Sequence, residues 1–492
     1  MTTVAKETTL LARHSLIYGL GTVTNRIAAF FLLPIYTRFL SSYDYGIKEL
    51  VGLSTDVIGI LLSTAIASAI YRFYFEYEDL EEKQEIIGSA LIGIGGIGII
   101  VLLVLYLFAR KISAMVLNSE ELYYYFIISF ISMWVNSLNN VGLDYFRATY
   151  QSIKFVALSV GRLIVNIFLN IYFICFLKIG VLGILFSTLI TSVLVLCILV
   201  VPLSIKIKLR FSTEKLREMI KFGLPLVPSQ LGGFIVHLSD RFFIKGYCSI
   251  AEAGIYSLGY RLGAMPANFI AYPFNQAWQP RRFELYKDKG SEVVFGKVFT
   301  YFLGLMIFAS LAVAGLSREI LMIIADRQFW DAYKVVPLIA LAITIFSFHY
   351  HFNIGILISK KTKYLAYINL SNAVLVITLN ILLISNYGVY GAALATLISF
   401  VYKTALTYYF SQKYYRIHFE FGRIFKIFLT AGIIYLALCS VNLSNIYASF
   451  LLKLAVIGLF PFLIFITGFF TETEMVKIRQ VIRTRSLDAL KI

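Results

Sequence analysis

Six cationic residues lie inside long apolar stretches of this sequence, and four of them are candidates for binding: Arg26, Lys48, Arg162 and Arg261. The other two are Lys403 and Lys453. Placing an arginine or lysine at the centre of an apolar layer costs about 2.5–3.5 kcal/mol on membrane-insertion scales. Residues kept at such positions usually face a water-filled cavity and bind something there. Because charged nitrogen groups hold phosphates and carboxylates by charge-assisted hydrogen bonds, these four residues predict a cavity that binds an anion.

Asparagines accompany these cations at helical spacing. Arg162, Asn166 and Asn170 stand four residues apart, which places them on one face of a helix. Asn136 and Asn140 form a second polar stripe with the same spacing. An amide both donates and accepts hydrogen bonds, as the recognition of sugar hydroxyls requires. The pattern therefore predicts a water-filled cavity that binds an anion with many hydroxyl groups.

Structural roles stay open for some of these charged residues. Lys48 could extend its ammonium group to the membrane surface, and Lys453 is expected to do so. Arg162 could pair with Asp56 or Asp144 and serve only the fold.

The composition identifies lipid as the surroundings of these residues. Of the 492 residues, 59% are hydrophobic and 14% are charged, and the mean hydropathy is +0.80. Soluble proteins carry about 25% charged residues, so a soluble fold is excluded. The net charge of +17 fits the usual excess of cations on the cytoplasmic side of a membrane protein, and no nucleic acid partner is expected. The four scattered cysteines are expected to be free thiols, and no metal or nucleotide motif is present.

The hydropathy pattern predicts an all-α membrane protein with about fourteen transmembrane helices of about 20 residues each. With the N-terminus inside, the inside segments hold 29 of the 44 Lys and Arg residues and the outside loops hold 9. Cytoplasmic loops carry the excess of Lys and Arg. Both termini are therefore predicted to be cytoplasmic.

The sequence also matches itself at an offset of 208 residues. Asp44–Ile47 falls on Glu252–Ile255, and Gly180 falls on Gly388. Because the repeat unit contains six predicted helices, its two copies keep the same topology and are related by an axis along the membrane normal.

The repeat predicts three parts of the chain. Residues 1–210 form an N-terminal lobe with helices 1–6, and residues 211–412 form a C-terminal lobe with helices 7–12. Residues 413–492 hold helices 13 and 14 and a basic cytoplasmic tail. Two similar lobes with a cleft between them suit transport by alternating access.

Several segments resemble the polysaccharide flippases of the Wzx type. The stretch NRIAAFFLLPIYTRFLSSYDYGIKEL, residues 25–50, resembles the start of their first lobe. GLPLVPSQLGGFIVHLSDRFFI and AGIYSLGYRLGAMP, residues 223–244 and 253–266, resemble the start of the second. These flippases belong to the multidrug/oligosaccharidyl-lipid/polysaccharide (MOP) exporter superfamily, with the MurJ-type lipid II flippases and the drug-exporting MATE proteins.

The resemblance implies a MATE/MurJ-like fold and a transporter, not an enzyme. Its implied cargo is an undecaprenyl-pyrophosphate-linked oligosaccharide, flipped from the inner to the outer leaflet of the bacterial inner (cytoplasmic) membrane for O-antigen or other surface polysaccharide synthesis. Arg26 and Arg261 match cavity arginines of the lipid II flippases, and Lys48 is an approximate match to another.

The resemblance further implies no bound cofactor and coupling to a Na⁺ or H⁺ gradient. Asp240, Asn369, Asn372 and Thr396 are the candidate cation site, although Asp240 and Arg241 could instead form an interfacial pair near the outer end of their helix. The implied partners are the lipid-linked oligosaccharide, membrane lipids, a polysaccharide polymerase and a chain-length regulator.

Two other functions stay open. An ion-coupled drug or cation exporter of the same superfamily is expected to have an acidic cavity, whereas this interior is rich in cations. A membrane polysaccharide polymerase needs a sizeable outer loop, and the longest one predicted here, residues 317–332, is short.

Overall fold

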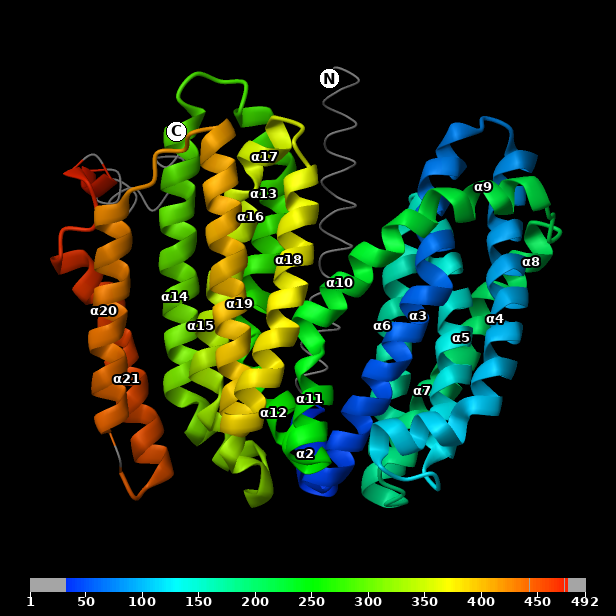
Figure 1. The fold of residues 1–492 in the computed structure, drawn as a ribbon, viewed down its shortest axis with the longest axis horizontal. Coiled ribbons are helices and arrows are strands. Elements are labelled where there is room, and N and C mark those ends of the chain that lie inside the picture. Colours follow the sequence, from blue (N-terminus) through cyan, green and yellow to red (C-terminus); the bar gives the residue numbers. More distant parts are fainter. Residues whose placement is uncertain (1–31, 442, 473, 477–492) are drawn as a thin grey trace. The chain divides into compact units, whose positions relative to one another are not determined.

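The structure is a computed structural model that describes residues 32–441, 443–472 and 474–476 (Figure 1). Every regular element within these residues is a helix. The predicted all-α membrane class is confirmed. The four cysteines are free thiols, as expected.

Eleven helices in the described residues are long and apolar enough to cross a membrane. One of them, Lys363–Tyr414, covers two of the predicted spans. Residues 251–278 were expected to form one helix but belong to three shorter ones; Pro266, which lacks a backbone N–H, stands between the first and the second. The first predicted span, residues 15–38, begins outside the described residues. The total of fourteen spans stays a prediction.

The chain divides into two compact units. Unit 1 holds the described residues up to Gly259 with Ile324–Ala332 and Ala366–Ser399, and unit 2 holds Tyr260–Ile323, Tyr333–Leu365 and the described residues from Phe400. The predicted boundaries of the two lobes stay a prediction.

The helices of unit 1 are α2 (Leu33–Phe39), α3 (Ser42–Glu76), α4 (Leu80–Leu117), α5 (Tyr123–Ala148), α6 (Ser152–Ile171), η1 (Tyr172–Phe176), α7 (Val181–Val195), η2 (Leu196–Val200), α8 (Val201–Lys206), α9 (Thr213–Gly223), η3 (Leu224–Leu226), α10 (Val227–Leu238), α11 (Asp240–Tyr247) and η6 (Asn380–Ile384). Those of unit 2 are η4 (Ala267–Ala271), α13 (Tyr272–Leu285), α14 (Ser291–Ile324, whose last residue counts with unit 1), α15 (Val336–Ser347), α16 (His349–Phe352), α17 (Ile354–Ile358), α20 (Phe421–Ser440) and α21 (Ile446–Ile466). The helices α12 (Ile250–Gly263), η5 (Arg327–Lys334), α18 (Lys363–Leu379) and α19 (Ser385–Tyr414) contribute residues to both.

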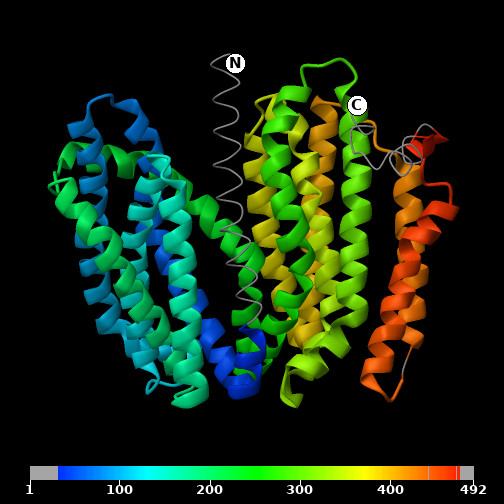
Figure 2. The same ribbon diagram turned by 180° about the vertical axis from the view of Figure 1, so that it is seen from behind.

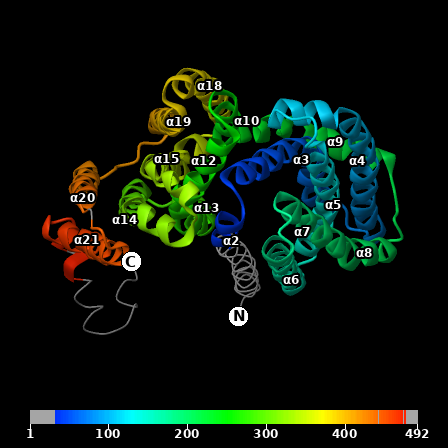
Figure 3. The same cartoon turned by 90° about the horizontal axis from the view of Figure 1, so that it is seen from below.

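In unit 1, α5 is the central helix. It packs against α3, α4 and α7, while α6 packs mainly on α7 (Figure 3). Large apolar side chains point away from this bundle, among them Leu107 and Phe168, which are 76% and 67% exposed. Exposed apolar surface on this scale is what a lipid-facing helix requires.

In unit 2, α20 and α21 pack side by side as a pair, drawn in orange and red in Figure 2. Leu438 of α20 and Ile457 of α21 both approach Gly315 of α14. The absence of a side chain at Gly315 lets this helix pair lie close to α14.

The 208-residue repeat is visible in the helix starts. Ser41 caps α3, where its hydroxyl accepts a hydrogen bond from the backbone N–H of Asp44 at 3.0 Å. At the same offset, the hydroxyl of Ser249 accepts one from the N–H of Glu252 at 3.1 Å, at the start of α12. An acidic residue in the first turn also suits the positive end of the helix dipole. The acidic residues of the repeat therefore start helices.

The repeat is also visible in two breaks of the backbone. The π-helix η1 is followed by Gly180 with φ +61°, and the π-helix η6 is followed by Gly388 with φ +56°. Glycine adopts this left-handed conformation without steric penalty. Since both breaks recur at the offset of 208 residues, the sequence repeat is a repeat of backbone structure.

Lys453 was expected to reach the membrane surface, and this is wrong. Its Nζ lies 2.7 Å from Oε1 of Glu319 in α14, and both side chains are buried. The hydroxyl of Ser449 donates to the same carboxylate oxygen at 2.8 Å. A buried carboxylate on the neighbouring helix satisfies the lysine, so it does not need to reach water.

Breaking this ion pair should destabilise unit 2. Lys453→Met leaves the buried Glu319 carboxylate unpaired, which costs about 3–5 kcal/mol. We expect a large fall in the melting temperature of the purified protein. The double variant Lys453→Met/Glu319→Leu, which removes both charges, should recover most of it. A single variant as stable as the wild type would show that the pair does not hold α21 to α14.

Candidate functional site

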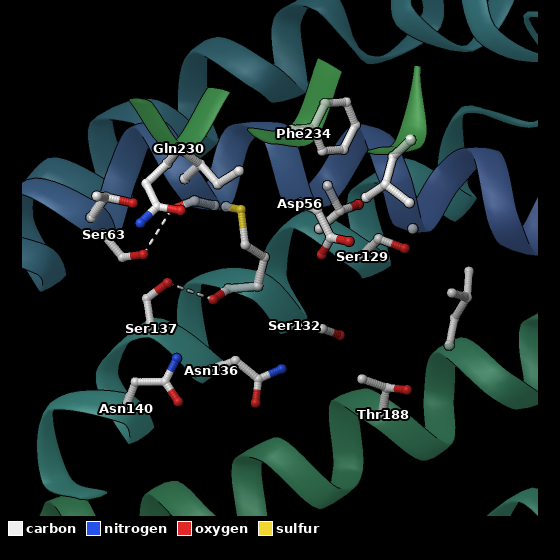
Figure 4. Close-up of a pocket in the computed structure, with 18 of the residues that line it drawn as sticks. Asp56, Ser63, Ser129, Ser132, Asn136, Ser137, Asn140, Thr188, Gln230 and Phe234 are labelled. Carbon is white, nitrogen blue, oxygen red and sulfur yellow. Dashed lines mark hydrogen bonds between the residues drawn. The ribbon is translucent and has the colours of Figure 1, made fainter. Parts of the chain in front are cut away.

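The main polar cavity of unit 1 has a volume of about 740 Å³ and lies between α3, α5, α7 and α10 (Figure 4). It lies within helices that are long and apolar enough to cross a membrane. Hydroxyl and amide side chains supply most of its polar lining: Thr55, Ser63, Thr64, Ser129, Ser132, Asn136, Ser137, Asn140, Thr188 and Gln230.

The α3 wall of the cavity is one continuous helix face. Lys48, Gly52, Asp56 and Gly59 follow one another at intervals of three or four residues and all line the cavity. A Cβ atom placed on Gly52 would meet no other atom within 4 Å. The glycine therefore leaves open space inside the cavity.

The α5 wall carries the two predicted asparagines and three serines that the sequence reasoning missed. Asn136 and Asn140 line the cavity together with Ser129, Ser132 and Ser137 (Figure 4). The spacing of three and four residues among these serines and asparagines was a signal that could have found them.

Few ionisable groups line the cavity. Among its described lining residues they are Lys48, Asp56 and His237. Lys48 lines the cavity: its Nζ lies 2.7 Å from Oε1 of Glu49 and within about 5.5 Å of two tyrosine ring centres. Most of the polar groups that line this cavity are therefore hydroxyls and amides, and few are charged.

Arg162 lies beside the cavity and does not line it. One of its terminal nitrogens donates to Oδ1 of Asn136 at 2.8 Å, and the hydroxyl of Ser192 donates to the same oxygen at 2.9 Å. The expected alternative, a pair with Asp144, is wrong, because that carboxylate accepts from Tyr71 at 2.7 Å and from Arg147 at 3.1 Å.

The other two residues of the Arg162 stripe extend the same network. Asn166 lines a smaller pocket with Arg162. The Nδ2 of Asn170 donates to Oδ1 of Asn166 at 3.0 Å, and its own Oδ1 accepts from the hydroxyl of Tyr36 at 3.0 Å. The predicted shared helix face is therefore present, but it meets neighbouring helices and a side pocket.

The two remaining cationic candidates are not placed against this cavity. Arg26 lies outside the described residues. Arg261 lies near the end of α12, in unit 2. Their role in anion binding stays a prediction.

Asp240 is part of a buried polar cluster in unit 1. Its Oδ1 lies 2.5 Å from a guanidinium nitrogen of Arg241, and its Oδ2 accepts from the hydroxyl of Tyr256 at 2.6 Å. That hydroxyl lies 3.5 Å from the hydroxyl of Thr396. Asp240 and Arg241 therefore do form the expected pair, and it is buried within the protein, with the two residues 4% and 3% exposed. Its position near the outer membrane interface stays a prediction.

The two asparagines of the candidate cation site differ. Asn372 is fully buried, and neither its amide oxygen nor its amide nitrogen has a hydrogen-bond partner among the described residues. Asn369 is exposed on α18. The structure thus brings Asp240 and Thr396 together through Tyr256, and it buries Asn372 but not Asn369.

The fold is that of known lipid and drug transporters. The chain is similar to a lipid II flippase MurJ in an inward closed conformation, with a TM-score of 0.72 and 16% identity over 91% of this chain and 98% of that one. It is also similar to an inward-facing multidrug resistance MATE family transporter of the MOP superfamily, with a TM-score of 0.62 and 15% identity over 80% and 94% of the two chains.

Three curated relatives match parts or most of the chain, and one of them is named for glycan biosynthesis. The chain is 23% identical over 43% of its length to the probable low-salt glycan biosynthesis flippase Agl15 of Haloferax volcanii, and it spans 46% of that protein. It is 24% identical over 56% of its length to the Lsg locus putative protein 1 of Haemophilus influenzae, and spans 67% of it. An uncharacterized membrane protein of Methanocaldococcus jannaschii matches over 90% of this chain and 91% of its own, at 20% identity.

A family model of polysaccharide biosynthesis proteins matches residues 35–291, which include all four walls of the cavity. The chain therefore belongs to the polysaccharide biosynthesis protein family, and it is a multi-pass membrane protein with the fold of the flippases and transporters of the MOP superfamily.

Proposed function

We propose that this protein flips an undecaprenyl-pyrophosphate-linked oligosaccharide from the inner to the outer leaflet by alternating access. The observation that carries the proposal is the polar cavity of about 740 Å³ within the membrane-spanning helices of unit 1. Its dense set of hydroxyl and amide groups matches the hydrogen-bonding needs of sugars. A hydrocarbon chain needs no such lining and stays in the surrounding lipid.

In this proposal the two ends of the headgroup meet different side chains. Asn136, Asn140 and the α5 serines hold sugar hydroxyls. Arg26, Arg261 and Lys48 hold the phosphates, because cations stabilise phosphate oxygens by charge-assisted hydrogen bonds. Arg162 acts behind this surface by orienting the Asn136 amide.

We further propose that a Na⁺ or H⁺ gradient drives the cycle through the Asp240 cluster. The buried amide of Asn372 and the carboxylate of Asp240 supply the oxygen atoms that a small cation prefers. The protein would act in the bacterial inner membrane with both termini in the cytoplasm. Its partners would be the lipid-linked oligosaccharide, a polysaccharide polymerase and a chain-length regulator.

Depletion of the protein tests this function directly. We expect lipid-linked oligosaccharide to accumulate on the cytoplasmic face, beyond the reach of an impermeant glycan probe, while surface polysaccharide is lost. Arg261→Ala should give the same result with the protein still in the membrane. Normal export by this variant would contradict the role of Arg261 as an anion clamp.

The MATE-like fold and the presence of Asp56 in the cavity favour one second candidate, an ion-coupled drug or cation exporter. Acidic residues in a cavity bind cations, so this alternative predicts altered drug tolerance on depletion and no change in lipid-linked oligosaccharide. Flipping that stays normal while polymer length falls would instead indicate a role in polymerisation.

A further inference from the structure

Two pockets lie on either side of one stretch of α6 in unit 1, and they share a wall. The first, here called the polar pocket, has a volume of about 410 Å³ and is lined by Arg147, Ser159, Arg162, Asn166, Thr188 and Thr191, among others. The second, here called the apolar pocket, has a volume of about 480 Å³ and is lined by Lys154, Gly161, Arg162, Val165, Leu194 and Ile198, among others. Arg162 and Thr191 belong to both.

The apolar pocket lies on the outer, apolar surface of unit 1. Its rim residues Ile198 and Leu194 are 65% and 44% exposed. These are the kind of side chains that face lipid in the described spans. A Cβ atom on Gly161 would meet no other atom within 4 Å, so the helix leaves open space at this point. The mostly apolar lining of the pocket suits a hydrocarbon chain from the surrounding bilayer.

The charges around the two pockets are cationic. Arg162 has no carboxylate partner among the described residues, and its one hydrogen bond goes to a neutral amide. Lys154 is exposed at the start of α6 and forms no ion pair within the described chain. Arg147 does have an acid, Asp144, at 3.1 Å. Two cations on one helix are therefore left to meet a negative group from outside the described residues.

The positions of these two cations suit an interfacial anion. Lys154 stands two residues after the start of α6, at the end of the span. Arg162 lies eight residues further, or about 12 Å along the axis at 1.5 Å per residue. One terminal nitrogen of Arg162 donates to Asn136, and the other N–H groups of its guanidinium can donate to a phosphate.

We propose that α6 forms a binding site for an anionic phospholipid, with its phosphate held by Arg162 and Lys154 and one acyl chain in the apolar pocket. The neighbouring polar pocket, with Ser159 between Lys154 and Arg162, takes a hydroxyl of the headgroup. Charge complementarity identifies the occupant, because two cations without acids favour an anionic headgroup over a zwitterionic one. Through Arg162 and Asn136 the bound lipid contacts the wall of the main cavity. The site does not depend on the proposed cargo.

The test is native mass spectrometry of the full chain in detergent, with phosphatidylglycerol or phosphatidylethanolamine added in equal amounts. We expect the wild type to retain phosphatidylglycerol preferentially. Arg162→Gln should lower its retention about tenfold, the scale of one charge-assisted hydrogen bond. Gly161→Phe should lower the retention of both lipids, because Gly161 lines the apolar pocket and a Cβ atom there meets no other atom within 4 Å, so the new side chain enters the pocket.

Lys206→Gln is the matched control. Lys206 is a cation at the end of α8, at the same end of the span as Lys154, and it lines neither pocket. The Lys206→Gln variant should therefore bind phosphatidylglycerol as the wild type does. Equal retention of the two lipids by the wild type, or unchanged binding by Gly161→Phe, would overturn the proposal. The Gly161→Phe variant leaves every charge in place. It therefore tests whether a lipid occupies the apolar pocket even if Arg162→Gln does not fold. Recovery of a polyprenyl-linked glycan in place of phosphatidylglycerol would make this a cargo site and would also overturn it.

Discussion

Replacing Gly52 by tryptophan is expected to stop transport while leaving the protein folded. Gly52 lines the main cavity, and a side chain there would enter open space, since a Cβ meets no atom within 4 Å. The indole would occupy the space between the α3 and α5 walls. We expect the export rate to fall about a hundredfold, which corresponds to about 2.7 kcal/mol in activation free energy. The measurement is the appearance of lipid-linked oligosaccharide on the outer face, probed with an impermeant lectin.

Gly96→Trp in α4 is the matched control for this prediction. Gly96 is exposed, a Cβ on it also meets no atom within 4 Å, and it does not line the cavity. It therefore adds the same side chain to a helix of the same unit without filling the cavity. Wild-type transport by Gly52→Trp, at wild-type protein levels, would show that the cargo does not pass through this cavity.

Breaking the buried pair of Asp240 and Arg241 should have a large effect on the stability of unit 1. Asp240→Asn removes the carboxylate charge that lies 2.5 Å from the Arg241 guanidinium, and Arg241 is only 3% exposed. Leaving one member of a buried ion pair uncompensated costs about 3–5 kcal/mol. The expected result is a large fall in melting temperature, measured by fluorescence-detected gel filtration, or a failure to accumulate in the membrane.

The double variant Asp240→Asn/Arg241→Gln separates the structural role from the proposed coupling role. Removing both charges should restore most of the stability, because no unpaired charge remains buried. If Asp240 couples transport to a cation, the stable double variant still fails to respond to an imposed Na⁺ or pH gradient. Normal gradient-driven transport by the double variant would leave Asp240 with a structural role only.

Some of the site could be predicted from the sequence because helical spacing places residues on a common face. Asn136 and Asn140 do line one cavity, and Arg162, Asn166 and Asn170 do share a helix face. The serines of α5 were missed, although they lie on the same face as the asparagines. A single serine hydroxyl is a weak signal in an apolar helix, because it can bond to the backbone carbonyl four residues earlier, as Ser137 does at 3.0 Å.

The partner of each membrane charge could not be predicted from the sequence. Lys453 pairs with Glu319, which is 134 positions earlier in the chain, and Arg162 bonds to Asn136 and not to an acid. Such pairs depend on which helices are neighbours and on how far each is rotated about its axis. Neither quantity follows from hydropathy, because apolar residues on all sides of a membrane helix leave its rotation unspecified.

The sequence by itself determined that the protein lies in a membrane, that its fold is all-helical and that it contains an internal repeat. Composition excludes water as the main surroundings, and a lipid environment requires every backbone group of an open chain to be satisfied within helices. The repeat follows from local signals, such as Ser41 with Asp44 and Ser249 with Glu252, which act within one helix turn. Only the tertiary structure decided which polar faces surround the cavity, which meet another helix and which face lipid, because these depend on contacts between segments far apart in the chain.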